Sequence, residues 1–124
     1  MNRSEIISRH VTKEIEIARD AGLKIVMGTD FVGAENSRHG DNAIEIERLS
    51  KFLGPTKALN ATTALAADCV GLDNAGRLKK GYSADLVVVK GNPLKDIRRV
   101  RKDAVKYVAH GSRIFNIDAI SRIS

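Results

Sequence analysis

Hydrophobic residues recur every three or four positions near the start of the chain, which is the spacing of one helix face. Ser4 is a suitable N-terminal cap for such a helix, and Gly22 is a suitable C-terminal stop. We therefore predict a helix between these residues with one buried face. Its apolar positions are Ile7, Val11, Ile15 and Ala18.

A short apolar run from Leu23 to Met27, interrupted only by Lys24, follows this helix and stops at Gly28-Thr29-Asp30. A nearly continuous apolar run is typical of a parallel strand that is covered on both faces. In α/β proteins, ligands and catalytic groups gather at the carboxyl ends of parallel strands. Asp30 is therefore the first candidate functional residue.

The following segment, residues 31–40, has no hydrophobic period and contains many turn-forming residues, so we expect a loop. A loop that leaves the carboxyl end of a strand often carries substrate-contacting groups, which makes His39 a second candidate. A surface-loop histidine without such a role is the equally supported alternative. His10, beside the apolar stripe of the first helix, is interpreted as a helix histidine without a ligand role.

The middle of the chain continues in helical patterns. Hydrophobic spacing and stop signals predict helices over residues 42–53, 56–62 and 64–70. The pair Thr62-Thr63 is expected to separate the last two helices, because β-branched hydroxyl residues favour helix ends over helix interiors.

In the last third of the chain, helical spacing gives way to short runs of β-branched residues. Runs rich in β-branched residues at 84–89, 106–109 and 113–115 are bounded by turn-forming residues and predict short strands. We therefore divide the chain into an α/β part, residues 1–74, and a β-rich part, residues 75–124.

Length and charge limit the function classes. The 124 residues are enough for one domain, whereas a complete α/β barrel needs about 250. The net charge of +6 is compatible with nucleic-acid binding, but the basic residues are scattered, and the densest run, residues 95–102, has no aromatic residue to stack on bases. A solvated basic surface is the preferred interpretation.

The only cysteine, Cys69, has no partner for an internal disulfide and is interpreted as a small buried hydrophobic residue. The first residues contain no apolar leader segment, and no run approaches the roughly 20 apolar residues needed to cross a bilayer. We therefore expect a cytoplasmic protein that does not enter a membrane.

Several motifs resemble the C-terminal part of metal-dependent amidohydrolases, in particular the imidazolonepropionase-like and prolidase-like branch. The most specific is the pattern Gly-x-Leu-x-x-Gly-x-x-Ala-Asp-Leu, which runs from Gly76 to Leu86. The others are Gly28-Thr29-Asp30 followed by His39-Gly40, the helix from Thr63 to Gly71-Leu72, and Gly91-Asn92-Pro93-Leu94. The resemblance as a whole covers the chain from about residue 9 to residue 115.

This resemblance implies an α/β fold made of the last strand–helix units of a (β/α) barrel and strands of a small composite β-sandwich domain. It also implies hydrolysis of carbon–nitrogen bonds in amides, cyclic amides or dipeptides by water activated on a divalent metal, zinc foremost. In that family the aspartate at the end of the last barrel strand, here Asp30, binds the metal and takes a proton from the attacking water. His39 matches a loop histidine near the substrate, and Asp85 is expected to be structural.

The family's other metal ligands, which include a His-x-His pair, have no counterpart among the 3 histidines of this chain. Since a catalytic zinc normally has three protein ligands, we do not expect the isolated chain to hold the metal. Three hypotheses remain: an amidohydrolase fragment completed by an N-terminal polypeptide, an inactive truncated relative that self-associates, and, least favoured, a basic nucleic-acid-binding module. Exposed apolar faces and strand edges favour a homo-oligomer or a heterocomplex.

Overall fold

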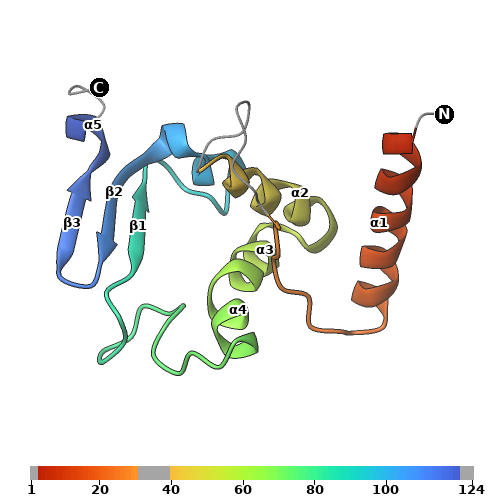
Figure 1. Cartoon of the computed structure of the whole chain (residues 1–124), viewed down its shortest axis with the longest axis horizontal. Coiled ribbons are helices and arrows are strands. Elements are labelled where there is room, and N and C mark those ends of the chain that lie inside the picture. Colours follow the sequence, from red (N-terminus) through yellow and green to blue (C-terminus); the bar gives the residue numbers. More distant parts are fainter. Residues whose placement is uncertain (1–2, 31–39, 121–124) are drawn as a thin grey trace.

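The structure is a computed structural model that describes residues 3–30 and 40–120. In chain order its elements are α1 (Arg3–Asp20), η1 (Asp41–Ala43), α2 (Ile44–Leu53), α3 (Pro55–Thr62), α4 (Ala64–Cys69), β1 (Leu86–Val89), η2 (Ile97–Val100), η3 (Lys102–Ala104), β2 (Val105–His110), β3 (Arg113–Asn116) and α5 (Ile117–Ile120). Figure 1 shows α1 at one end of the molecule, the strands at the other, and α2 to α4 between them.

The predicted first helix is confirmed as α1, although it begins at Arg3, before the predicted cap Ser4, and its last residue, Asp20, lies two positions before the predicted stop Gly22. Gly22 has a φ of 71° and donates its amide to the carbonyl oxygen of Arg19, while Leu23 donates to Ala18, both at 3.0 Å. These two bonds satisfy carbonyl groups that the end of a helix leaves unpaired.

The expected buried face of α1 is found only in part among the residues whose side chains are described. Val11 is 48% exposed, whereas Ile15 and Ala18 are partly buried. The helix meets α2 near its own end, where the Arg19 side chain donates to the carbonyl oxygen of Phe52 at 3.3 Å. The apolar stripe of α1 therefore has little to pack against within the described part of the chain.

The predicted strand at residues 23–27 is also wrong. This segment has no regular secondary structure, and Leu23 is 64% exposed. A strand needs a neighbouring strand to complete its backbone hydrogen bonds. Here the amide of Met27 instead donates to the carbonyl oxygen of Ala61, at the end of α3, over 3.1 Å.

The core between α2 and α3 is small and aliphatic. Leu49, Ala58 and Ala61 are its buried residues, with 7%, 0% and 1% of their surface exposed. The partly buried side chains around it are Ile25, Met27, Ile46 and Leu53. The irregular segment before Asp30 thus packs on α3 because two alanines leave room for it.

The helix break at Thr62-Thr63 is confirmed, since α3 ends at Thr62 and α4 begins at Ala64. The prediction that Cys69 is buried is wrong, because this thiol is exposed. Ala67 is the buried residue of α4, and a residue two positions further along a helix points to the opposite side.

The predicted β-rich end of the chain is confirmed. The described strands form one antiparallel sheet in the order β1-β2-β3, with Val87 opposite Val108 and Val108 opposite Phe115. The sheet is joined to α2 by Arg101, whose guanidinium donates to one carboxylate oxygen of Glu47 at 2.9 and 2.5 Å.

Candidate functional site

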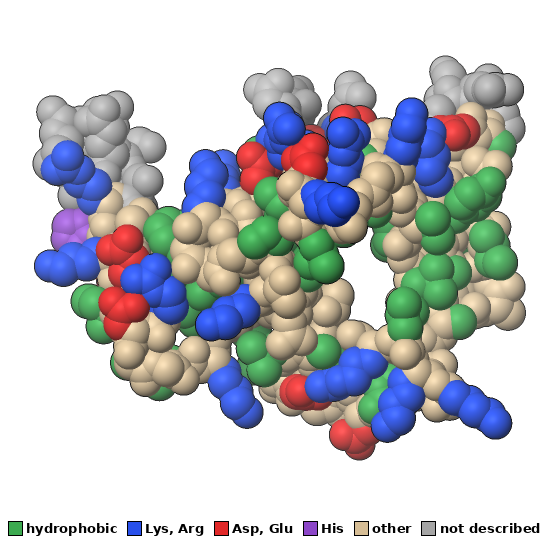
Figure 2. Space-filling view, turned by 180° about the vertical axis from the view of Figure 1, so that it is seen from behind, with side chains coloured by type: hydrophobic (Ala, Val, Ile, Leu, Met, Phe, Trp, Pro, Cys, Tyr) green, Lys and Arg blue, Asp and Glu red, His purple; other side chains and the backbone are tan. Residues whose placement is uncertain are grey.

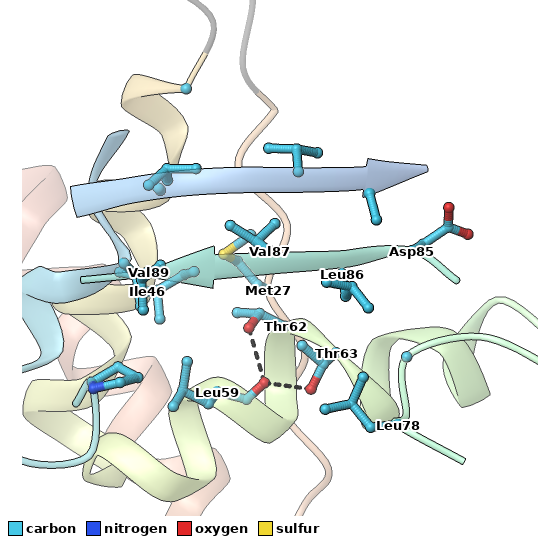
Figure 3. A pocket seen from close by; sticks show the side chains of 18 of the residues that line it. Met27, Ile46, Leu59, Thr62, Thr63, Leu78, Asp85, Leu86, Val87 and Val89 are labelled. Atoms are coloured by element: carbon cyan, nitrogen blue, oxygen red, sulfur yellow. Dashed lines mark hydrogen bonds between the residues drawn. The ribbon is translucent and has the colours of Figure 1, made fainter. Parts of the chain in front are cut away.

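A hollow of about 970 Å³ separates the sheet from the helices. Figure 2 shows it as an opening with hydrophobic side chains along the sheet side. Its wall includes valines and leucines of β1 and β2, Leu59 of α3 and Leu78 of the turn after α4, while Asp85 and His110 stand at one end. The labelled side chains of Figure 3 belong to this wall, and Met27 lies between β1 and α3.

The polar end of the hollow is organised around the carboxylate of Asp85. Its Oδ2 accepts the hydroxyl of Ser83 at 2.5 Å, and its Oδ1 accepts the amide of Gly111 at 3.1 Å. Oδ1 also lies 2.6 Å from Nδ1 of His110. These contacts join the start of β1 to the turn between β2 and β3.

Hydrogen bonds from Ser83, and then from His110, lower the pKa of Asp85 from its ordinary value. The carboxylate is therefore held in its charged form by groups of its own sheet. Because each of these partners belongs to a strand end or turn, the arrangement suits the structural role that the sequence resemblance implied for Asp85.

Asp30 lies outside this hollow, three residues after Met27. It is exposed and has a φ of 44°, the one positive φ found at a non-glycine residue in the described part of the chain. Non-glycine residues adopt this left-handed region at an energetic cost, and such residues cluster at functional sites. The other predicted site residue, His39, falls outside the described residues.

The described residues do not provide a complete metal site. Within residues 3–30 and 40–120, no group of three or more His, Cys, Asp or Glu side chains lies close enough to hold an ion. Asp30 offers one carboxylate, whereas a catalytic zinc normally has three protein ligands and an open position. His10 is exposed on α1 and adds no such cluster.

The turn after α4 packs directly on the break between α3 and α4. A methyl group at Gly76, whose φ is 72°, would lie 2.6 Å from the carbonyl oxygen of Thr63. The next residue, Arg77, donates two hydrogen bonds to the carboxylate of Asp68, at 2.8 and 2.6 Å. This bridge lowers the pKa of Asp68 and raises that of Arg77. Sequence reasoning identified Gly76 as part of a motif but missed this contact.

Several residues of the basic run are paired with acids. Arg98 and Arg99 both lie within salt-bridge distance of Asp96, at 2.8 and 3.3 Å, and Arg101 pairs with Glu47. These pairings neutralise part of the positive charge that suggested nucleic acid. Among the described helices, none has the length and apolarity required to cross a bilayer.

Comparison with known proteins gives consistent matches. The model of the Amidohydrolase family matches residues 1–114. Ochratoxinase from Aspergillus niger is 33% identical over 108 residues, which is 83% of this chain and 22% of that protein. A 5-methylthioadenosine/S-adenosylhomocysteine deaminase from Caldicellulosiruptor saccharolyticus is 34% identical over 82 residues, 60% of this chain and 19% of that protein.

Solved structures agree with the sequence matches. A prolidase complexed with N-methylphosphonate-L-proline superposes with a TM-score of 0.74 at 33% identity, over 84% of this chain and 26% of that one. The A. niger ochratoxinase structure gives a TM-score of 0.71 at 32% identity, over 84% of this chain and 24% of that one. The chain thus spans about a fifth of the curated relatives it matches and about a quarter of these structures.

Proposed function

The chain belongs to the amidohydrolase family, and from this premise we propose that it forms the C-terminal portion of an enzyme that hydrolyses carbon–nitrogen bonds. In this proposal residues 1–74 supply the end of a (β/α) barrel, in which a strand from the rest of the enzyme would pair with residues 23–27, and residues 75–124 supply strands of a small β-sandwich. The observation that carries the proposal is the family match over residues 1–114, which includes Asp30. Similarity to prolidase and ochratoxinase favours an amide or dipeptide substrate.

Asp30 is the residue through which this chain would take part in the reaction. An exposed carboxylate is available to accept a proton from an attacking water, which is the task of a general base. The proposed enzyme would use a divalent metal, with Asp30 as one ligand and the other ligands supplied by residues outside the printed sequence. His39 is proposed to contact the substrate.

The exposed apolar surface supports the proposal that further polypeptide covers this chain in the active enzyme. On the sheet, Val87 is 56% exposed and Ile114 is 75% exposed, and Leu23, in the segment that leads to Asp30, is 64% exposed. Apolar area of this kind is normally covered in a stable assembly. We therefore propose that the rest of an amidohydrolase covers these faces in the active enzyme.

An inactive, self-associating relative is the second candidate, because the described residues contain no complete metal cluster. In that case copies of this chain would cover the same faces. Both candidates predict association, but only the first predicts hydrolysis once the remaining part of an amidohydrolase is supplied.

A hybrid enzyme separates the two candidates. Residues 1–114 of this chain would replace the matching C-terminal quarter of the solved prolidase, and dipeptide hydrolysis and bound metal would be measured. The parent without its C-terminal quarter is the negative control, and a cooperative melting transition shows that the hybrid is folded. The proposal predicts turnover and bound metal in the hybrid alone; a folded hybrid without turnover would favour the inactive relative.

A further inference from the structure

The break between α3 and α4 determines the hydrogen-bond partner of the Ala61 carbonyl oxygen. In an uninterrupted helix this oxygen would accept the amide of Leu65, four residues further on. Because α3 ends at Thr62, Ala61 lies in the last turn, where carbonyl groups have no partner within the helix. Its oxygen instead accepts the amide of Met27 at 3.1 Å.

The side chains of the two threonines at the break hydrogen-bond to the preceding turn of α3. The hydroxyls of Thr62 and Thr63 both donate to the carbonyl oxygen of Leu59, at 2.9 and 2.8 Å (Figure 3). In a regular helix that oxygen would accept the amide of Thr63, so the hydroxyls substitute for the backbone donor. Thr63 has φ −125° and ψ −96°, which is outside the helical region.

The freed carbonyl holds the segment that leads to Asp30. Met27 stands three residues before Asp30, and its side chain, with that of Ile25, packs against the core that contains Ala61. We propose that Thr62 and Thr63 are positioning residues for Asp30: by ending α3 they free the Ala61 carbonyl oxygen to bind the Met27 amide. This inference rests on the proposed function of Asp30.

The test replaces both threonines with alanine in the full 124-residue chain. Alanine is the strongest helix former, so the helix should run through the break and the Ala61 oxygen should return to Leu65. Hydrogen exchange at the Met27 amide is expected to become about tenfold faster, because opening of a local hydrogen bond is what exchange reports. Amides of β2, in the distant sheet, should not change.

Two matched variants isolate the hydroxyl groups. The double change Thr62→Ser and Thr63→Ser keeps both donors and should exchange at Met27 like the wild type. Thr56→Ala alters an exposed threonine in the first turn of the same helix and should also leave Met27 unchanged. Unchanged exchange at Met27 in the double-alanine variant would overturn the proposal.

The kinetics of the hybrid enzyme supply a second measurement, because a change in helix stability alone would not alter kcat. The double-alanine change should lower kcat about tenfold or more with KM within about twofold, since displacement of a catalytic group affects the chemical step, and the double-serine change should restore kcat. Unchanged kcat in an active double-alanine hybrid would also overturn the proposal. A wild-type hybrid without activity would refute the proposed function, while exchange at Met27 would still decide whether the threonines control this segment.

Discussion

The Met27 amide and the Ala61 carbonyl oxygen are hydrogen-bonded at 3.1 Å, which ties the segment before Asp30 to the last turn of α3. The segment can approach α3 closely because the helix residues that face it, Ala58 and Ala61, have small side chains, which are 0% and 1% exposed. Within the described part of the chain, the segment before Asp30 is therefore held by small side chains and a helix end rather than by strand pairing.

The first prediction concerns this close contact. Ala58→Leu adds a side chain where no space is left and should lower the free energy of unfolding by about 1–3 kcal/mol, the usual cost of overpacking. Urea denaturation measures the change. Asn60→Leu, at an exposed position of the same helix, is the matched control and should have little effect. Equal losses in the two variants would contradict the packing described.

The second prediction concerns Gly76. Alanine there must adopt a φ near 72° and place its methyl group 2.6 Å from the Thr63 carbonyl oxygen. Gly81 has a φ of 87° with nothing within 4 Å of an added methyl group, so Gly81→Ala should cost about 1–2 kcal/mol through backbone strain alone. Gly76→Ala should cost a further 1–3 kcal/mol or so through the clash. Denaturation curves that coincide for the two variants would refute the contact.

Local features of the fold were predictable from the sequence. The stop at Gly22 and the break at Thr62-Thr63 depend on interactions between near neighbours in the chain, and both are found where expected. The β-rich end was also predictable, because its strands pair with each other.

Features that depend on distant partners were not predictable. Residues 23–27 have the composition of a buried strand, but the described chain offers them a helix end in place of a neighbouring strand. Cys69 was expected to be buried on composition alone, and α4 turns it outward. The Met27–Ala61 bond was missed, although the adjacent threonines were the signal that a carbonyl group nearby would be free.

The third prediction concerns pH. Hydrogen bonds from Ser83 and His110 lower the folded-state pKa of Asp85, so its stabilising contribution is present above the unfolded-state pKa and is lost as pH falls through the folded-state value. Asp85→Asn should lower Tm near neutral pH, and the difference from wild type should shrink towards about pH 2. Ser83→Ala removes the largest cause and should give part of the same effect. Parallel Tm curves for wild type and Asp85→Asn would contradict this account.

The fourth prediction concerns association. With Val87, Ile114 and Leu23 more than half exposed, the isolated chain should sediment as a species larger than a monomer at about 10 μM. Ile114→Lys should weaken this association through the face of the sheet that carries Ile114. Lys90→Arg, which keeps the charge at an exposed position, should not weaken it. A compact monomer under these conditions would count against the need for a covering partner.

We propose Asp30 as the carboxylate that this chain contributes to hydrolysis, and Asp30→Asn in the hybrid enzyme tests this role. Asparagine tolerates the left-handed backbone found at this position, so the variant removes the charge and keeps the conformation. Asp73→Asn makes the same chemical change at an exposed turn residue. If Asp30 is the general base, kcat should fall by about a hundredfold or more for Asp30→Asn and stay unchanged for Asp73→Asn. Undiminished turnover in the Asp30→Asn hybrid would rule out this role for Asp30.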